Sequence, residues 1–180
     1  MRIEKIVSRE KIDFILNRRS CRDFFPEPLK EGDLQLLLEC LRKAPSAGNL
    51  QPWFFYVVFN ESKKRELAKA AYGQSFIASA SVVFVVCAEP EASAKYYGNR
   101  GKTLYCIQDT AAAVENLLLS ATALGYGSCW IGAFDKDKAS MVLDIPGNLM
   151  PVAIVPVGYG SFTEPPTSRK PIDKTFAFIK

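Results

Sequence analysis

The side chains best suited to bind a ligand lie in one short loop in the first third of the chain. The loop carries two amides, Asn49 and Gln51, close to a hydroxyl, Ser46. An amide offers a donor and an acceptor together, which suits the edge of a flat heterocycle where donors and acceptors alternate. Pro45 cannot continue a helix, and Gly48 and Asn49 both tolerate left-handed backbone angles. The loop is therefore either a constrained binding loop or an ordinary turn from a helix into a strand.

A second candidate site is basic. Arg18, Arg19 and Arg22 flank Ser20, so three guanidinium groups and a hydroxyl occur within five residues. Forked guanidinium donors and a hydroxyl can surround a phosphate. The alternative is a solvated basic helix end, where cations suit the helix dipole. The arginines also predict a lowered pKa for Cys21, if its thiol points toward them.

Two further segments complete the set. Gly132, in the stretch 127–135, lets a backbone N–H approach a ligand closely, although the same stretch is also consistent with a strand that bulges at this glycine. Arg169 and Lys170 place two more cations in the C-terminal tail.

The composition limits the chemistry that these residues can perform. The 180 residues carry a net charge of +4 without a basic block, which fits one domain and an anionic ligand and gives no indication of nucleic-acid binding. There is no histidine, so histidine-dependent nucleophiles and most zinc sites are excluded, and no metal is expected. Five scattered cysteines without a Cys-x-x-Cys pair predict free thiols. No apolar run is long enough to span a membrane and the N-terminus lacks a signal-peptide core, so we expect a cytoplasmic protein.

Periodicity and capping residues predict the elements that position these segments. Helices are expected over 9–18 with Ser8 as cap, 31–43, 62–71 with Ser62 as cap, 103–124, and 136–143 with Asp135 as cap; strands are expected over 53–59, 82–88 and 152–159. We expect the first strand to be buried, and Pro156 predicts an edge position or a bulge for the last. The polar face of the helix at 62–71, which includes Lys64, is expected to be solvated.

Three segments carry less regular signals. Residues 89–102 are polar and rich in small residues around Tyr96 and Tyr97, which is typical of a surface loop or of a lid that places aromatic rings over a site. The helix at 103–124 is apolar almost all round, which indicates burial from several sides, either centrally or at a subunit interface. The tail at 161–180 cannot form an apolar unit alone and is expected to pack on another element of the chain or on another subunit.

Taken together, these segments resemble the FMN-dependent nitroreductase family over nearly the whole chain. Each motif is short, and the resemblance rests on their order and spacing. The matching residues are Arg18 to Arg22, Ala44 to Trp53, Gln108 to Ala113, Asn116 to Leu119, Trp130 to Asp135, Val157 to Gly160, and Arg169 to Pro171.

The resemblance implies an α+β fold of three layers, αβα, with a mostly antiparallel central sheet. It also implies a homodimer, with the tail at 161–180 exchanged onto the partner subunit and an FMN site at the interface. Arg18, Ser20 and Arg169 would hold the phosphate with help from Arg19 or Lys170; Arg22 and Asn49 would face the pyrimidine edge of the ring; Ser46 and Gln51 would support the loop; and the backbone of Ile131, Gly132 and Ala133 would approach the ring near N5.

The activity implied is hydride transfer from NADH or NADPH to FMN, followed by reduction of a small acceptor such as a quinone or a nitroaromatic compound. A flavin-binding protein without turnover, or a specialised family member such as a dehalogenase or a flavin-cleaving or azoline-oxidising enzyme, is the alternative. One departure concerns the phosphate site, since Thr167 and Ser168 stand where a basic residue often precedes the C-terminal arginine.

Overall fold

A four-stranded antiparallel sheet forms the centre of the computed structural model, which describes residues 12–162 and 165–179. The strand order is β2 (Trp53–Val58), β3 (Val82–Ala88), β5 (Met150–Gly158) and β4 (Gly127–Ser128). Every residue of β3 is buried, as its unbroken apolar sequence predicts for a strand covered on both faces.

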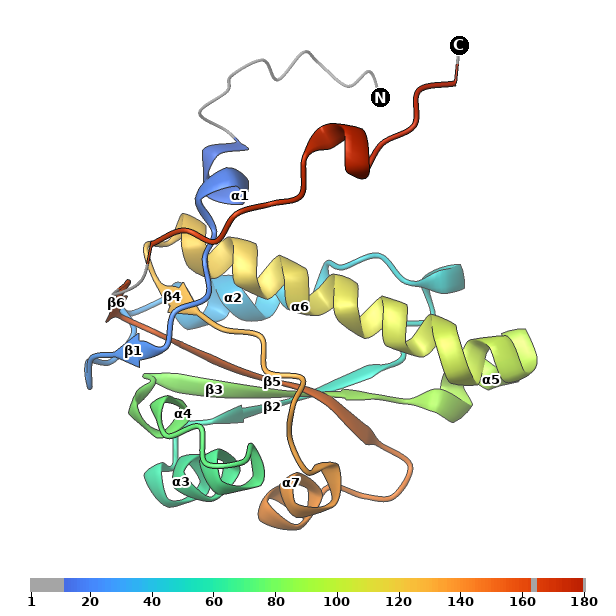
Figure 1. Cartoon of the computed structure of the whole chain (residues 1–180). Coiled ribbons are helices and arrows are strands. Elements are labelled where there is room, and N and C mark those ends of the chain that lie inside the picture. The colour runs from blue at the N-terminus through green and yellow to red at the C-terminus, as the bar shows by residue number, and fades with distance from the viewer. Residues whose placement is uncertain (1–11, 163–164, 180) are drawn as a thin grey trace.

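Helices cover both faces of this sheet and make three layers (Figure 1). One face packs against α2 (Asp33–Arg42) and α6 (Cys106–Ala123), and the other packs against α3 (Glu61–Ala70), α4 (Phe76–Ser79) and α7 (Lys136–Leu143). Alternate residues of β3 enter the two cores, because side chains of a strand point to opposite faces in turn. The predicted α+β fold with a mostly antiparallel sheet between helices is confirmed.

Shorter elements connect and flank the layers. A short helix, α1 (Asp13–Asn17), precedes β1 (Asp23–Phe24), which pairs with β6 (Gly160–Ser161). The helix α5 (Pro90–Arg100) runs into a π-helical turn, η3 (Gly101–Tyr105), before α6, and 3-10 turns occur at η2 (Ala47–Asn49) and η4 (Ile172–Lys174).

Two details of the predicted helices change. Asn60, rather than Ser62, caps α3, with its side-chain oxygen accepting a hydrogen bond from the Lys63 N–H at 3.0 Å. Lys64 is buried rather than solvated, and its Nζ donates to the carbonyl of Ala80 at 2.7 Å. Burial lowers the pKa of this amine. Asp135 caps α7 as expected, and Ser8 lies outside the described residues.

The predicted burial of the first strand is wrong. The strand β2 lies at an edge of the sheet, and Phe54 is 48% exposed, because only β3 pairs with it in this chain. For the last strand we expected an edge position, which it does not have, or a bulge; its pairing with β3 does shift register, opposite Val86 and Cys87 rather than at Pro156. The strand β5, which contains Pro156, lies inside the sheet between β3 and β4. The Pro156 carbonyl accepts from the Cys129 N–H at 3.3 Å, so this residue of β5 faces Cys129, just beyond the end of β4. The N–H that proline lacks is therefore not needed for the pairing of β4 with β5.

Residues 89–102 form a helix rather than a loop. Pro90 occupies the first turn of α5, where its fixed φ is favourable and its missing N–H costs no bond. Gly98, at φ 55° and ψ −142°, interrupts the helix before η3. Tyr96 is 71% exposed and Tyr97 is 39% exposed, so the segment still presents aromatic rings at the surface. Its role as a lid stays a prediction.

Candidate functional site

The basic segment 18–22 is attached to the end of the sheet next to β4. The Cys21 N–H donates to the carbonyl of Ser128 at 2.8 Å, and Ser20 forms a parallel bridge with Ser128. Burial raises the pKa of the Cys129 thiol, while the charges of Arg22 and Arg18 and a hydrogen bond with Ser20 oppose that rise. Arg18, Ser20 and Arg22 therefore all lie close enough to Cys129 to act on its thiol.

The Arg19 side chain contacts an aromatic ring, unlike the other side chains of the basic segment. Its guanidinium carbon lies 4.8 Å from the centre of the Phe162 ring, which is within the range of a cation–π interaction. This contact ties the basic segment to the stretch that follows β6. It leaves Arg18, Ser20 and Arg22 as the side chains gathered near Cys129.

Cys21 faces the core, so the prediction of a lowered pKa for its thiol is wrong. The side chain is fully buried, and burial raises its pKa. The thiol lies near the carbonyls of Asp23, at 3.3 Å, and Ser161, at 3.5 Å. A Cβ at Gly127 would lie 2.6 Å from the Cys21 Cβ, and a Cβ at Gly160 would lie 2.6 Å from its Sγ. The buried Cys21 side chain therefore fits only because positions 127 and 160 are glycines.

The predicted backbone segment 131–133 follows Ser128 and Cys129 directly in the chain. Ile131 is buried and exchanges hydrogen bonds with Ile154 at 2.9 and 3.0 Å, which fixes the start of the segment. Gly132 and Ala133 are exposed, and a Cβ at Gly132 would meet nothing within 4 Å. The Gly132 N–H has no acceptor among the residues that the structure describes, so an incoming ligand has an open approach to this donor.

The amide loop adopts the left-handed conformation expected for Gly48 and Asn49. Their φ angles are 58° and 56°, and Gln51 shares this conformation with φ 52°. Ser46 holds the loop together, because its carbonyl accepts from the Asn49 N–H and its Oγ accepts from the Gln51 N–H, both at 2.9 Å. The Gln51 amide nitrogen donates to the Asn49 carbonyl at 3.3 Å. Ser46 and Gln51 thus make hydrogen bonds within the loop, and their part in binding stays a prediction.

The loop is anchored at the beginning of α6. The Ala47 N–H donates to Asp109 Oδ1 at 3.0 Å, and a Cβ at Gly48 would lie 2.5 Å from the hydroxyl of Tyr97 in α5. Sequence reasoning assigned no role to Asp109. The signal that could have found it is an acidic residue on the buried face of an otherwise apolar helix.

The two halves of the predicted site lie at opposite ends of α6 within one chain. The amide loop contacts Asp109 in the first turn of α6, whereas the basic segment contacts Gly127 and Ser128 beyond the last turn. At 1.5 Å per helical residue, the interval from Asp109 to Ala123 alone is about 20 Å. Figure 1 shows this separation, with α5 at one end of α6 and α1 with β4 at the other.

Arg169 and Lys170 lie in the exposed C-terminal tail. The Arg169 guanidinium donates to the carbonyl and hydroxyl of Thr167, at 3.1 and 2.9 Å, so its hydrogen bonds are local. All of the described residues 165–179 are exposed, including Phe176 and Phe178. The tail therefore has an apolar surface that this chain leaves uncovered.

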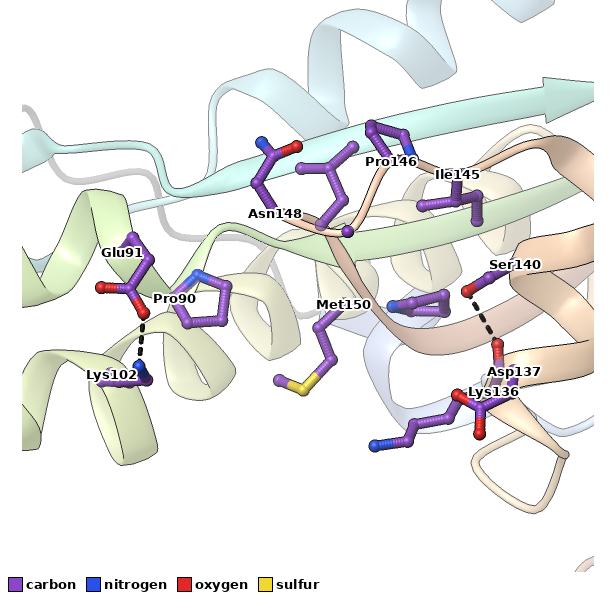
Figure 2. A pocket seen from close by; sticks show the side chains of 13 residues that line it. Pro90, Glu91, Lys102, Lys136, Asp137, Ser140, Ile145, Pro146, Asn148 and Met150 are labelled. Carbon is purple, nitrogen blue, oxygen red and sulfur yellow. Dashed lines mark hydrogen bonds and ion pairs between the residues drawn. The ribbon is translucent and has the colours of Figure 1, made fainter.

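Two hollows elsewhere on the surface contain none of the predicted site residues. One, of about 470 Å³, lies between α5 and α7 and is lined by Glu91, Lys102, Lys136 and Asp137 together with apolar side chains (Figure 2). Glu91 and Lys102 form an ion pair on one wall. A second hollow of about 470 Å³ includes Phe24, Phe59 and the buried Lys64. Neither hollow unites the amide loop with the basic segment.

The described part of the chain contains neither a metal-ligand cluster nor a membrane-spanning helix. No group of cysteine, aspartate or glutamate residues there could hold a metal ion. No helix there has the length and apolar character needed to cross a membrane. The five cysteines are free thiols.

Comparison with known proteins gives consistent matches. The profile of the Nitroreductase family matches residues 15–76 and 69–159. A Thermus thermophilus protein named NADH dehydrogenase is 31% identical over 186 residues, covering 88% of this chain and 91% of that protein. A Bacillus subtilis protein named FMN reductase (NADPH) is 27% identical over 161 residues, covering 82% of this chain and 65% of that protein. The crystal structure of a nitroreductase-like protein from Streptococcus mutans superposes with a TM-score of 0.87 at 25% identity, covering 95% and 98% of the two chains.

Proposed function

We propose that this chain, which belongs to the nitroreductase family, is an oxidoreductase that binds FMN and takes a hydride from NADH or NADPH. The electrons then pass to a small electron-poor acceptor such as a quinone or a nitroaromatic compound. The family match and the names of the relatives, one an NADH dehydrogenase and one an NADPH-dependent FMN reductase, support this activity.

The observation that carries the proposal is the convergence of phosphate-type donors beside an open backbone N–H. Arg18, Ser20 and Arg22 gather around Cys129, and three residues along the chain Gly132 presents an N–H without an acceptor in the described chain. Ser128, which adjoins Ser20, adds a buried hydroxyl without a hydrogen-bond partner among the described residues. Cations and unpaired donors fit a phosphorylated flavin.

Bound FMN would supply the two-electron chemistry, and this chain's residues would supply position and charge. Arg18 and Ser20 would hold the phosphate, with Arg169 as a further candidate. Arg22 would place a positive charge at the pyrimidine edge, where negative charge accumulates on reduction, and so favour the reduced state. Asn49 would offer a donor and an acceptor to the same edge, and the Gly132 N–H would point toward the ring near N5. No side-chain base is needed, which agrees with the absence of histidine.

We further propose that a homodimer completes the site. Because the amide loop and the basic segment lie at opposite ends of α6, one chain cannot bring Asn49 to Arg22. A second copy, related by a two-fold axis across α6, would bring the amide loop of one subunit to the basic segment of the other and form two sites. The outer face of α6, with Ala112 and Leu119 only partly buried, and the uncovered tail at 165–179 offer apolar surface for such an interface. The tail would then lie on the partner subunit.

The absorbance spectrum of the purified protein and a turnover assay test this function. We expect flavin bands in the visible spectrum, bleaching on addition of NADH or NADPH, and oxidation of the nicotinamide when menadione is present. A protein that binds FMN but is not reduced by either nicotinamide would be a flavin carrier. A protein that is reduced but turns over neither quinones nor nitroaromatics would be a specialised member of the family. The activity and the composition suit a cytoplasmic enzyme.

A further inference from the structure

Asp109 is a buried carboxylate that has no role in the proposed binding of FMN. Its side chain is 7% exposed. Oδ1 accepts one hydrogen bond, from the Ala47 N–H, and Oδ2 has no partner in the described chain. Burial raises the pKa of this carboxyl, and the bond from Ala47 opposes the rise only in part. A half-satisfied buried carboxylate costs stability, so this position would be more stable with a neutral residue of similar size.

The single bond of Asp109 is made to the first residue of the Ala47–Asn49 turn. Such an N–H at the start of a helical turn has no partner within the turn. The side chain just before the turn usually accepts from the second or third N–H of the turn instead. Here that side chain is Ser46, whose Oγ instead accepts from the Gln51 N–H. Asp109 therefore caps the turn from 62 residues away in sequence.

The capped turn contains the left-handed part of the loop. Gly48 and Asn49 both have positive φ, a conformation that few residue types other than glycine and asparagine adopt readily. The Asn49 N–H donates to the Ser46 carbonyl at 2.9 Å and closes the turn directly after the capped residue. A shift at Ala47 would therefore change the direction of the Asn49 side chain.

We propose that Asp109 is a positioning residue that fixes the Ala47–Asn49 turn and so aims the Asn49 amide. The inference rests on the proposed function, in which that amide faces the flavin of a shared site. Asp109 itself does not touch the ring in this scheme; it acts through the backbone of Ala47. The half-satisfied carboxylate thus serves binding at a cost in stability.

The test uses the full-length protein and two readouts: hydrogen exchange of the Asn49 amide without cofactor, and FMN affinity from quenching of flavin fluorescence. Asp109→Ala removes the acceptor, so exchange at Asn49 should become faster and FMN affinity should fall, each by about tenfold. Asp109→Asn keeps an oxygen that can accept from Ala47, so both quantities should stay within about threefold of wild type. Asp109→Leu removes the acceptor without leaving a cavity and should behave like Asp109→Ala.

Asn60→Ala is the matched control, because it removes another 3.0 Å cap, on the Lys63 N–H of α3, far from the amide loop. It should lower the melting temperature while leaving Asn49 exchange and FMN affinity unchanged. Unchanged exchange and affinity in Asp109→Leu, or in Asp109→Ala if that variant folds, would overturn the positioning role. If wild-type protein binds no FMN, the proposed function fails, and the exchange measurement still reports on Asp109 independently.

Discussion

The basic segment 18–22 and the amide loop 46–51 are assigned to one flavin, yet the chain holds them in different ways. The basic segment is attached by backbone pairing to Ser128 and by the buried thiol of Cys21, so its position follows that of the sheet. The amide loop pairs with no strand of the described chain and depends on Ser46 and on the distant Asp109. The basic segment is therefore held in place by the core, whereas the position of the amide loop depends on a few polar contacts.

The separation of the two halves has a consequence for assembly. In the proposed site, each half alone lacks part of the full set of phosphate and ring-edge donors. Binding affinity for FMN and the dimerisation equilibrium should then be linked, because a ligand that contacts both subunits stabilises the dimer. The predictions below separate the contributions of the two halves.

The largest effect is expected from mixing two defective proteins. Arg18→Ala and Asn49→Ala homodimers should each bind FMN weakly, because every shared site contains one defect. In a mixed dimer, one site would hold both defects and the other none, so random mixing should restore about one quarter of the sites to wild-type affinity. Fluorescence titration after subunit exchange measures this fraction. Restoration of no sites would place Arg18 and Asn49 of the same chain in one site.

Removal of a single phosphate contact should have the next largest effect. Arg18→Ala and Arg169→Ala should each weaken FMN binding by about ten- to a hundredfold, since a hydrogen bond to a charged group contributes about 1.5–3 kcal/mol. Riboflavin, which lacks the phosphate, is the control ligand and should lose little affinity in either variant. Equal loss of FMN and riboflavin would show that these arginines do not bind the phosphate.

Adding a methyl group to one glycine in each half should reveal which half is rigid. Gly127→Ala would place a Cβ 2.6 Å from the buried Cys21 Cβ, so it should destabilise the fold by about 1–3 kcal/mol and displace the basic segment. Gly48→Ala would meet the movable tip of Tyr97 and adopt a φ near 58°, at a cost of about 1–2 kcal/mol. Urea denaturation measures both losses.

The same two variants should differ in ligand preference. Gly127→Ala should weaken FMN more than riboflavin, because it moves the phosphate ligands. Gly48→Ala should weaken both ligands alike, because it moves the loop that faces the ring. A reversed preference would contradict the assignment of the two halves.

The smallest predicted effect concerns the midpoint potential of the bound flavin. Arg22→Ala should lower it by about 30 mV, equivalent to 1.4 kcal/mol for a two-electron couple, because one partly screened positive charge is lost near the reduced ring. Asn49→Ala should change it less, since neutral hydrogen bonds serve both oxidation states more equally. Spectroelectrochemical titration at saturating FMN compares them. An unchanged potential in Arg22→Ala would assign this arginine to the phosphate or to the surface.

Residue types and local sequence patterns alone determined many of the helices, strands, caps and turns of this protein. Leu37 and Leu41 predicted the buried face of α2, the apolar run at 82–88 predicted β3, and Asp135 predicted the cap of α7. The loop of Gly48 and Asn49 was likewise predictable from backbone preferences. Each of these features depends on residues within a few positions of one another, so the sequence records them directly.

Only the tertiary structure decided how these parts face each other. The burial of Lys64, the inward direction of the Cys21 thiol and the place of Pro156 inside the sheet all depend on partners far away in sequence. The bond from Ala47 to Asp109 and the length of α6 likewise place the amide loop and the basic segment at opposite ends of one helix, although the resemblance assigns both to one flavin. Composition and spacing determine which groups are present, whereas the packing of helices on the sheet determines which of them can meet.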